Sequence, residues 1–177
     1  MIGEGDPDPI LESELRQGAG REWSEEAAED ERMTEKLRER RMELSGRMRE
    51  FVARGQRVRA EAGSLSCSGT VVFAGTDYSV IDRDDDEVAV RLMSATWTLE
   101  PGGRSGHHQT GNSMSFKAHL AQLESSGEEV RIVIGDGRQT SGSVTTAAQD
   151  SIVIDHDGTE VLIPLVAVIA VARPKPR

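Results

Sequence analysis

The stretch from residue 55 to residue 101 resembles the stretch from residue 127 to residue 174, and this internal similarity limits the possible folds more than any other feature. With one extra position opened in the first stretch, 17 identities align in a single frame. They include Gly69 with Gly142, Asp82 with Asp155, and the closing Pro101 with Pro174. Because turn residues match as well as apolar ones, the pattern indicates a duplicated unit.

Each unit is predicted to hold one helix followed by five short strands. Apolar residues spaced by four and three positions mark one face of a helix, in the order Leu44, Met48, Phe51 and then Phe116, Leu120, Leu123. Strict alternation follows, as in Val58, Ala60 and Ala62, which places one face of a strand inward. We expect the long helical stretch that leads into the first unit to bend or break at Ser45-Gly46. A sheet this small removes its exposed edges best by bending and closing on itself.

Three motifs resemble the Sm-like small barrel: a glycine in the second strand, an aspartate that opens the third strand, and the pattern VLIPLVAVIAV at residues 161–171. The resemblance to the bacterial Sm-like RNA chaperones is clearest over residues 142–174, and small helix-plus-barrel proteins of high-GC bacteria are similar too. It implies barrels that associate through edge strands, the fourth of one with the fifth of its neighbour. Where RNA-binding members carry an asparagine, this chain has Val80 and Val153, and their Tyr-Lys-His segment falls on 162–164. The RNA-reading residues are therefore absent.

The predicted fold class is α+β, with two tandem helix-plus-five-stranded Sm-like (SH3-like) small β-barrels and an acidic N-terminal helical extension. The predicted boundaries are a disordered acidic tail at 1–22, a charged helix at 23–45, the first repeat at 46–101, a glycine-rich linker at 102–112, the second repeat at 113–174 and a tail at 175–177.

Charge and composition disfavour several classes of protein. The net charge is −10, and residues 1–45 alone hold 14 acidic and 7 basic side chains, whereas nucleic-acid binders usually show a basic surplus. The longest apolar run, 161–172, is too short to span a membrane, which takes roughly 20 residues. The single cysteine, Cys67, excludes an intramolecular disulfide framework and is interpreted as a packing residue. We expect a cytoplasmic protein.

No catalytic, cofactor or metal site is predicted. The adjacent His107 and His108 lie in a glycine-rich linker without other ligands at metal-binding spacing. The acidic turns at 82–87 and 155–160 could hold a divalent cation, but Asp side chains that bond their own backbone explain them more simply. No nucleophile motif or phosphate-binding loop occurs, so an enzyme is the least favoured class.

The favoured function is a non-enzymatic interaction or regulatory module that works through the barrel edges and the N-terminal helix, with a protein partner or a second copy. Its candidate partner-binding residues are Trp23, Met33, Leu37, Val166, Val168 and Val171. The N-terminal helix is either a docking arm or merely solvated, and the apolar strand 166–172 needs a cover from the first unit or from another copy. The alternative is RNA or DNA binding on a barrel surface, which would need Arg54, Arg57, Arg59, Arg131 and Arg138 on one face.

Overall fold

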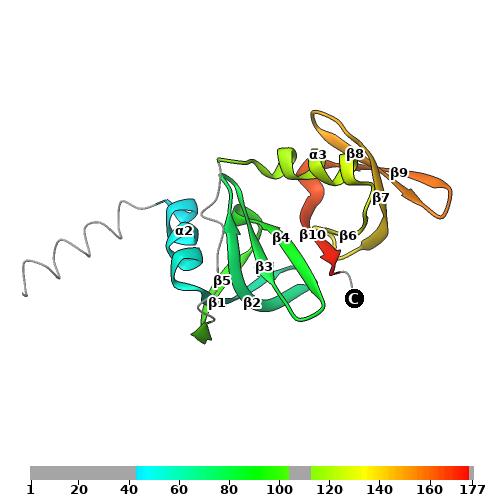
Figure 1. Ribbon diagram of the computed structural model, residues 1–177. Coiled ribbons are helices and arrows are strands. Elements are labelled where there is room, and N and C mark those ends of the chain that lie inside the picture. The colour runs from blue at the N-terminus through cyan, green and yellow to red at the C-terminus, as the bar shows by residue number, and fades with distance from the viewer. Residues whose placement is uncertain (1–42, 104–112, 176–177) are drawn as a thin grey trace, which may run out of the picture. The chain divides into compact units, whose positions relative to one another are not determined.

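The computed structural model describes residues 43–103 and 113–175, which belong to one compact unit, Glu43–Arg177 (Figure 1). The first half of this unit runs α2 (Leu44–Arg54), β1 (Gln56–Ala62), β2 (Leu65–Ala74), β3 (Tyr78–Asp82), β4 (Asp86–Arg91), the 3₁₀ turn η1 (Leu92–Ser94) and β5 (Thr96–Gly103). The second half runs α3 (Phe116–Ser126), β6 (Glu129–Ile134), β7 (Gln139–Ala147), β8 (Ser151–His156), β9 (Thr159–Pro164), η2 (Leu165–Ala167) and β10 (Val168–Pro174).

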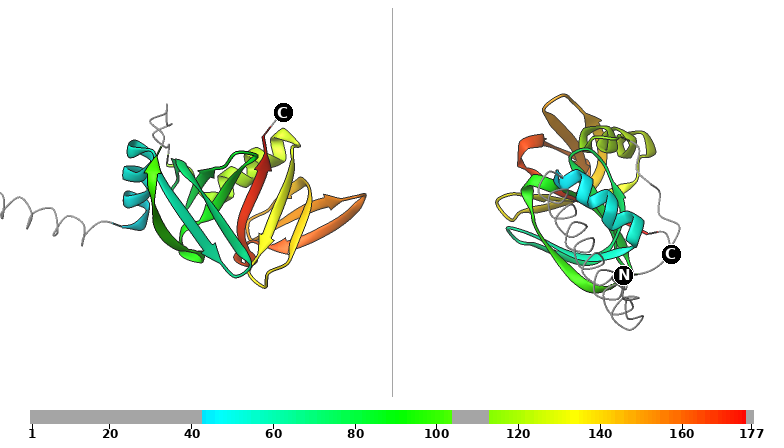
Figure 2. Two further views of the ribbon diagram at one scale, coloured as in Figure 1. Left: turned by 90° about the horizontal axis from the view of Figure 1, so that it is seen from below. Right: turned by 90° about the vertical axis from the view of Figure 1, so that its left-hand side faces the viewer.

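Both described helices form where the apolar spacing predicts them. Each ends at a glycine in the left-handed region, Gly55 at φ 61° and Gly127 at φ 63°, where a side chain would be strained. The first helix begins at Leu44, directly after Glu43 in extended conformation, so the helix boundary lies one to two residues before the predicted Ser45-Gly46, and both of these residues lie in the first turn. At the start of α3, the Ser115 hydroxyl accepts a hydrogen bond from the Ala118 N–H. The helices pack on the sheet, α2 on β1 and β2 and α3 on β7 (Figures 1 and 2).

The ten strands form one antiparallel sheet in the order β5-β1-β2-β3-β4-β10-β6-β7-β8-β9. This corrects the fold class predicted from the sequence, because the strands do not close into two tandem five-stranded Sm-like barrels. The fourth strand β4 pairs with β10, the fifth strand of the second half, with Ala89 opposite Val171 and Val88 opposite Ala172. The prediction of two repeated, self-contained barrels is therefore wrong, and the sheet is continuous and open.

The two halves of the sheet also share their hydrophobic cores. The first core contains Val133 from β6 and Ala172 from β10 beside residues of the first half. The second core contains Tyr78 and Ala89, from β3 and β4, beside residues of the second half. This exchange follows from strand geometry, because successive side chains point to opposite faces and a shared strand therefore serves both cores. Neither half has a complete core of its own.

The apolar strand predicted to need a cover has one. Strand β10 lies between β4 and β6, and Val168 and Val171 are buried. The ion pair from Arg173 Nη2 to Glu87 Oε2, 2.6 Å long, fastens the far end of the β4–β10 ladder. The cover comes from the first half of the same chain.

Cys67 is buried in the first core, in agreement with its interpretation as a packing residue. Burial raises the pKa of its thiol to about 11, so the group is protonated and unreactive at neutral pH. In the described parts of the chain, no helix has the length and apolar character to cross a membrane.

Because the cores are shared, the two halves should unfold together. Ile152, fully buried in the second core, is mutated to Ala in a Trp23→Phe background, so that Trp97 in the first half reports alone. We expect the free energy of unfolding that Trp97 fluorescence reports in urea to fall by about 2 to 5 kcal/mol, the usual cost of such a cavity. The exposed Gln149→Ala serves as control. An unshifted Trp97 transition would show that the halves fold separately.

Gly69 sets how closely β2 approaches β3. A Cβ at this position would lie 2.3 Å from the Asp82 carbonyl oxygen, a backbone atom that cannot move aside, whereas a Cβ at Gly135 meets nothing closer than 3.7 Å. Gly69→Ala should therefore lower the free energy of unfolding by at least about 2 kcal/mol, and Gly135→Ala should change it little. Urea denaturation of both variants checks this, and equal stabilities would contradict the described strand packing.

Candidate functional site

Among the described residues, the two terminal strands of the sheet, β5 and β9, have a neighbouring strand on one side only. Strand β5 pairs with β1, and β9 pairs with β8. The outer side of such a strand presents N–H and C=O groups that can pair with another polypeptide. These two edges are therefore candidate interaction sites.

The exposed large apolar side chains gather at these edges. Among the described residues, those that stand out are Leu99 on β5, Leu162 on β9, Met93 in the turn before β5 and Val166 in the turn after β9, exposed by 58, 68, 90 and 86%. A lone exposed apolar side chain needs no explanation, but two at each open edge mark surfaces suited to a partner. The edges thus combine free backbone groups with uncovered apolar area.

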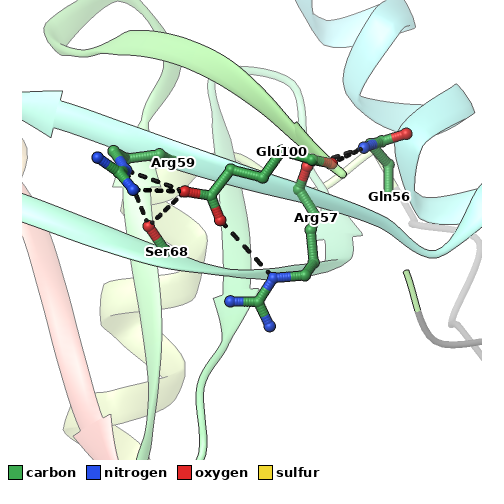
Figure 3. A network of polar contacts seen from close by, with 5 residues as sticks. All are labelled: Gln56, Arg57, Arg59, Ser68 and Glu100. Atoms are coloured by element: carbon green, nitrogen blue, oxygen red, sulfur yellow. Dashed lines mark hydrogen bonds and ion pairs between the residues drawn. The ribbon is translucent and has the colours of Figure 1, made fainter. Parts of the chain in front are cut away.

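The outer face beside the β5 edge is organised around the Glu100 carboxylate (Figure 3). Its Oε1 accepts hydrogen bonds from Arg59 Nε at 2.9 Å and from the Ser68 hydroxyl at 3.1 Å. Arg57 Nε lies 3.6 Å from Oε2, and the Gln56 side-chain amide donates to the Glu100 backbone carbonyl at 2.8 Å. These contacts join β1, β2 and β5, so they hold the terminal strand against the sheet.

The environment of Glu100 lowers the pKa of its carboxyl group. Desolvation alone would raise this pKa, but the hydrogen bonds from Ser68 and Arg59, together with the charges of Arg59 and Arg57, outweigh it. The carboxylate is therefore ionised at neutral pH and holds both arginines. The edge strand is positioned by ionic contacts that weaken in acid.

A groove of about 620 Å³ lies between β2 and β3 on one side and the α3 region on the other. Tyr78 packs beneath it, with ring centroids 5.4 Å from Phe73 and 5.2 Å from His119, which stacks on it. Burial, and then the charge of Arg173, lower the pKa of His119, whereas Glu87 opposes this effect. The charged groups on the rim are already paired, Arg173 with Glu87 and Lys175 with Asp82.

The carboxylates of the two acidic turns contact other groups of the protein. In the described part of the chain, no three side chains of metal-ligating type come together in a way that could hold a metal ion. In the first turn, Asp86 lies 3.3 Å from Arg83 and 3.1 Å from Arg131. In the second turn, Asp155 accepts a hydrogen bond from the backbone N–H of Gly158 at 2.8 Å, so this Asp side chain bonds the backbone of its own turn.

The candidate partner-binding residues fall in different places. Val166 is exposed beside the β9 edge, whereas Val168 and Val171 are buried in β10 and face the second core. Trp23, Met33 and Leu37, and the linker histidines His107 and His108, lie outside the described residues. Of the six, Val166 alone is seen to be available to a partner within the described fold.

The arginines of the nucleic-acid alternative each have a carboxylate partner. Arg57 and Arg59 share Glu100. The others pair as Arg54 with Glu50, Arg131 with Asp86 and Arg138 with Asp136, at 3.9, 3.1 and 2.6 Å. Arg57 and Arg59 lie on β1, Arg131 on β6 and Arg138 in the turn after β6. Phosphate contacts at these positions would compete with existing ion pairs.

Sequence reasoning missed Leu162, Leu99 and Glu100. Leu162 stands in the apolar run of residues 161–163, and such a run does not tell which side chain faces outward. Alternation in TWTLE, residues 96–100, could have marked the outward position of Glu100, but not its two arginine partners. The sequence matches no protein-family model and no curated protein.

Glu100→Gln should destabilise the protein in a pH-dependent way. The folded pKa lies below its ordinary value of 4.5, so the stabilisation is present above that value and disappears as the pH falls through the folded pKa. Urea midpoints of the wild type and the variant should differ at neutral pH and converge in acid, once the pH has fallen below the folded pKa of Glu100. Glu61→Gln, an exposed residue of the neighbouring strand β1, serves as control. A constant difference at both pH values would contradict the ionic role of Glu100.

Proposed function

We propose that the protein is a non-enzymatic interaction module that binds polypeptide partners at the open edges β5 and β9. The observation that carries the proposal is that Leu99, Leu162, Met93 and Val166, large and exposed, lie on or beside these two strands. A partner segment in extended conformation would gain ladder hydrogen bonds from the edge and cover these side chains.

The charge distribution supports a protein partner over nucleic acid. The net charge is −10, and the arginines proposed for phosphate contacts already hold carboxylates. Binding phosphate would require these ion pairs to break, and counterion release would supply little in a surface of balanced charge. Nucleic-acid binding therefore remains the alternative.

The N-terminal residues Trp23, Met33 and Leu37 are proposed as a second contact, with the apolar side chains of a charged helix as the docking face. We place the protein in the cytoplasm, where a single buried thiol such as Cys67 stays reduced. A regulatory role would then follow from competition between partners for the same edges.

A photo-reactive amino acid at position 166 or 99 tests the proposal in the native host. Irradiation should give a discrete adduct of higher mass from each edge, and adding Leu162→Lys should abolish the adduct from position 166, because a charge on the edge opposes strand addition. Both sites are exposed, so the fold should tolerate the changes.

The same reactive group at the exposed Gln149, in the turn between β7 and β8, is the matched control. Adducts no stronger than this control would reject the edges as interaction sites. An adduct that nuclease shortens would favour the nucleic-acid alternative.

A further inference from the structure

We infer that the partner at these edges is a second copy of the same chain, bound head to tail, with β9 of one copy pairing with β5 of the next. The inference rests on the proposed function and names its partner. It comes from the junction already present within the chain, where β4 and β10 pair as antiparallel neighbours.

Strand β9 occupies the place in the second half that β4 occupies in the first. Ala89 of β4 pairs with Val80 of β3, and Leu162 of β9 pairs with Val153 of β8. Both strands follow a tight turn and lead into a 3₁₀ turn, η1 or η2. On its outer side, however, β4 has β10 as a neighbour, whereas β9 has none in the described sheet.

Strand β5 similarly occupies the place of β10. Val171 of β10 pairs with Ile132 of β6, and Trp97 of β5 pairs with Ala60 of β1. Ile132 and Ala60 are each the fifth residue after the glycine that ends the preceding helix. The two open edges are thus the counterparts of the two strands that already pair inside the chain.

Copying the internal register onto the open edges places Leu162 opposite Trp97, as Ala89 lies opposite Val171. The copied ladder covers five positions, residues 159–163 against residues 96–100, because the internal ladder covers residues 86–90 against 170–174. Both segments lie within β9 and β5. Pro164 and Pro101, which cannot donate ladder hydrogen bonds, fall just outside these five positions.

The side chains fit this arrangement. Leu162 and Leu99 would lie on the same side of the new ladder as Trp97, which already packs against the first core. Leu162 would thereby extend the first core of the neighbouring copy, as Ala89 extends the second core within the chain. Val161 would lie opposite Thr98 on the other side, a pair of β-branched residues suited to a ladder. The contact is heterologous, so every added copy leaves one β9 and one β5 edge open until a ring closes or a filament grows.

Complementing edge variants test this directly. Leu162→Lys blocks β9 and leaves β5 open, and Leu99→Lys blocks β5 and leaves β9 open; both residues are exposed, so folding should be kept, as circular dichroism checks. In light scattering after size-exclusion chromatography from about 1 to 100 µM, the wild type should exceed a dimer and each variant alone should be a monomer. An equimolar mixture of the two variants should give a 1:1 dimer, at least tenfold tighter than either variant with itself.

Cysteine cross-linking tests the register. Protein with Val161→Cys mixed with protein with Thr98→Cys should form a disulfide-linked dimer, because directly opposed ladder positions bring the Cβ atoms within disulfide reach. Thr96→Cys, two positions away on the same strand, should cross-link at least tenfold less. Cys67 is buried and stays out of the reaction.

The remaining outcomes overturn the inference. If Leu99→Lys alone still forms a dimer, β9 pairs with β9 and the head-to-tail contact is wrong. If the wild type is a monomer throughout and the mixed variants do not associate, there is no contact between copies. Adducts from positions 166 and 99 with a different protein would then leave the proposed function standing. If no such adducts form, both the proposed function and the contact between copies are rejected.

Discussion

The pairing of β4 with β10 is the contact on which the rest of the described structure depends. It joins Asp86–Val90 to Ala170–Pro174 and is closed at one end by the Glu87–Arg173 ion pair. Since alternate residues of these strands point to opposite faces, the same few positions complete both hydrophobic cores. Without this ladder, each half of the sheet would expose an unpaired strand and an unfinished core.

Smaller contacts reinforce this junction along its length. The Asp77 carboxylate accepts a hydrogen bond from the Phe116 backbone N–H at 2.7 Å and so fixes the start of α3 to the turn before β3. Arg91 donates to the Leu165 carbonyl at 3.0 Å, and the Ser64 hydroxyl donates to the Gly137 carbonyl at 3.0 Å. Each bond links one half of the sheet to the other. Together they fix the relative position of the two halves at the start of α3 and at the turns.

A continuous open sheet still has two edge strands, and the function we propose follows from the residues at these edges. The β5 edge carries threonines and the β9 edge ends at Pro164, features that limit unspecific strand addition. Yet Leu99 and Leu162 remain exposed there. An edge with these features favours pairing with one complementary strand over unspecific strand addition. The internal β4–β10 ladder indicates the register and the side chains of such a strand.

The sequence by itself determined the local structure. Apolar spacing located α2 and α3, alternation located the strands, and Gly55 and Gly127 ended the helices, because these features depend on neighbours a few residues apart. The apolar run 166–172 also indicated a strand covered on both sides. Only the tertiary structure decided which strand covers it. Alternation tells which face of a strand is buried but not which strand lies beside it. The prediction of two separate closed barrels was therefore wrong, because β4 pairs with β10 in one continuous sheet. The exposure of Leu162, and the contacts of the Glu100 carboxylate with Arg59, Ser68 and Arg57, likewise depend on residues distant in sequence. No local pattern records such contacts.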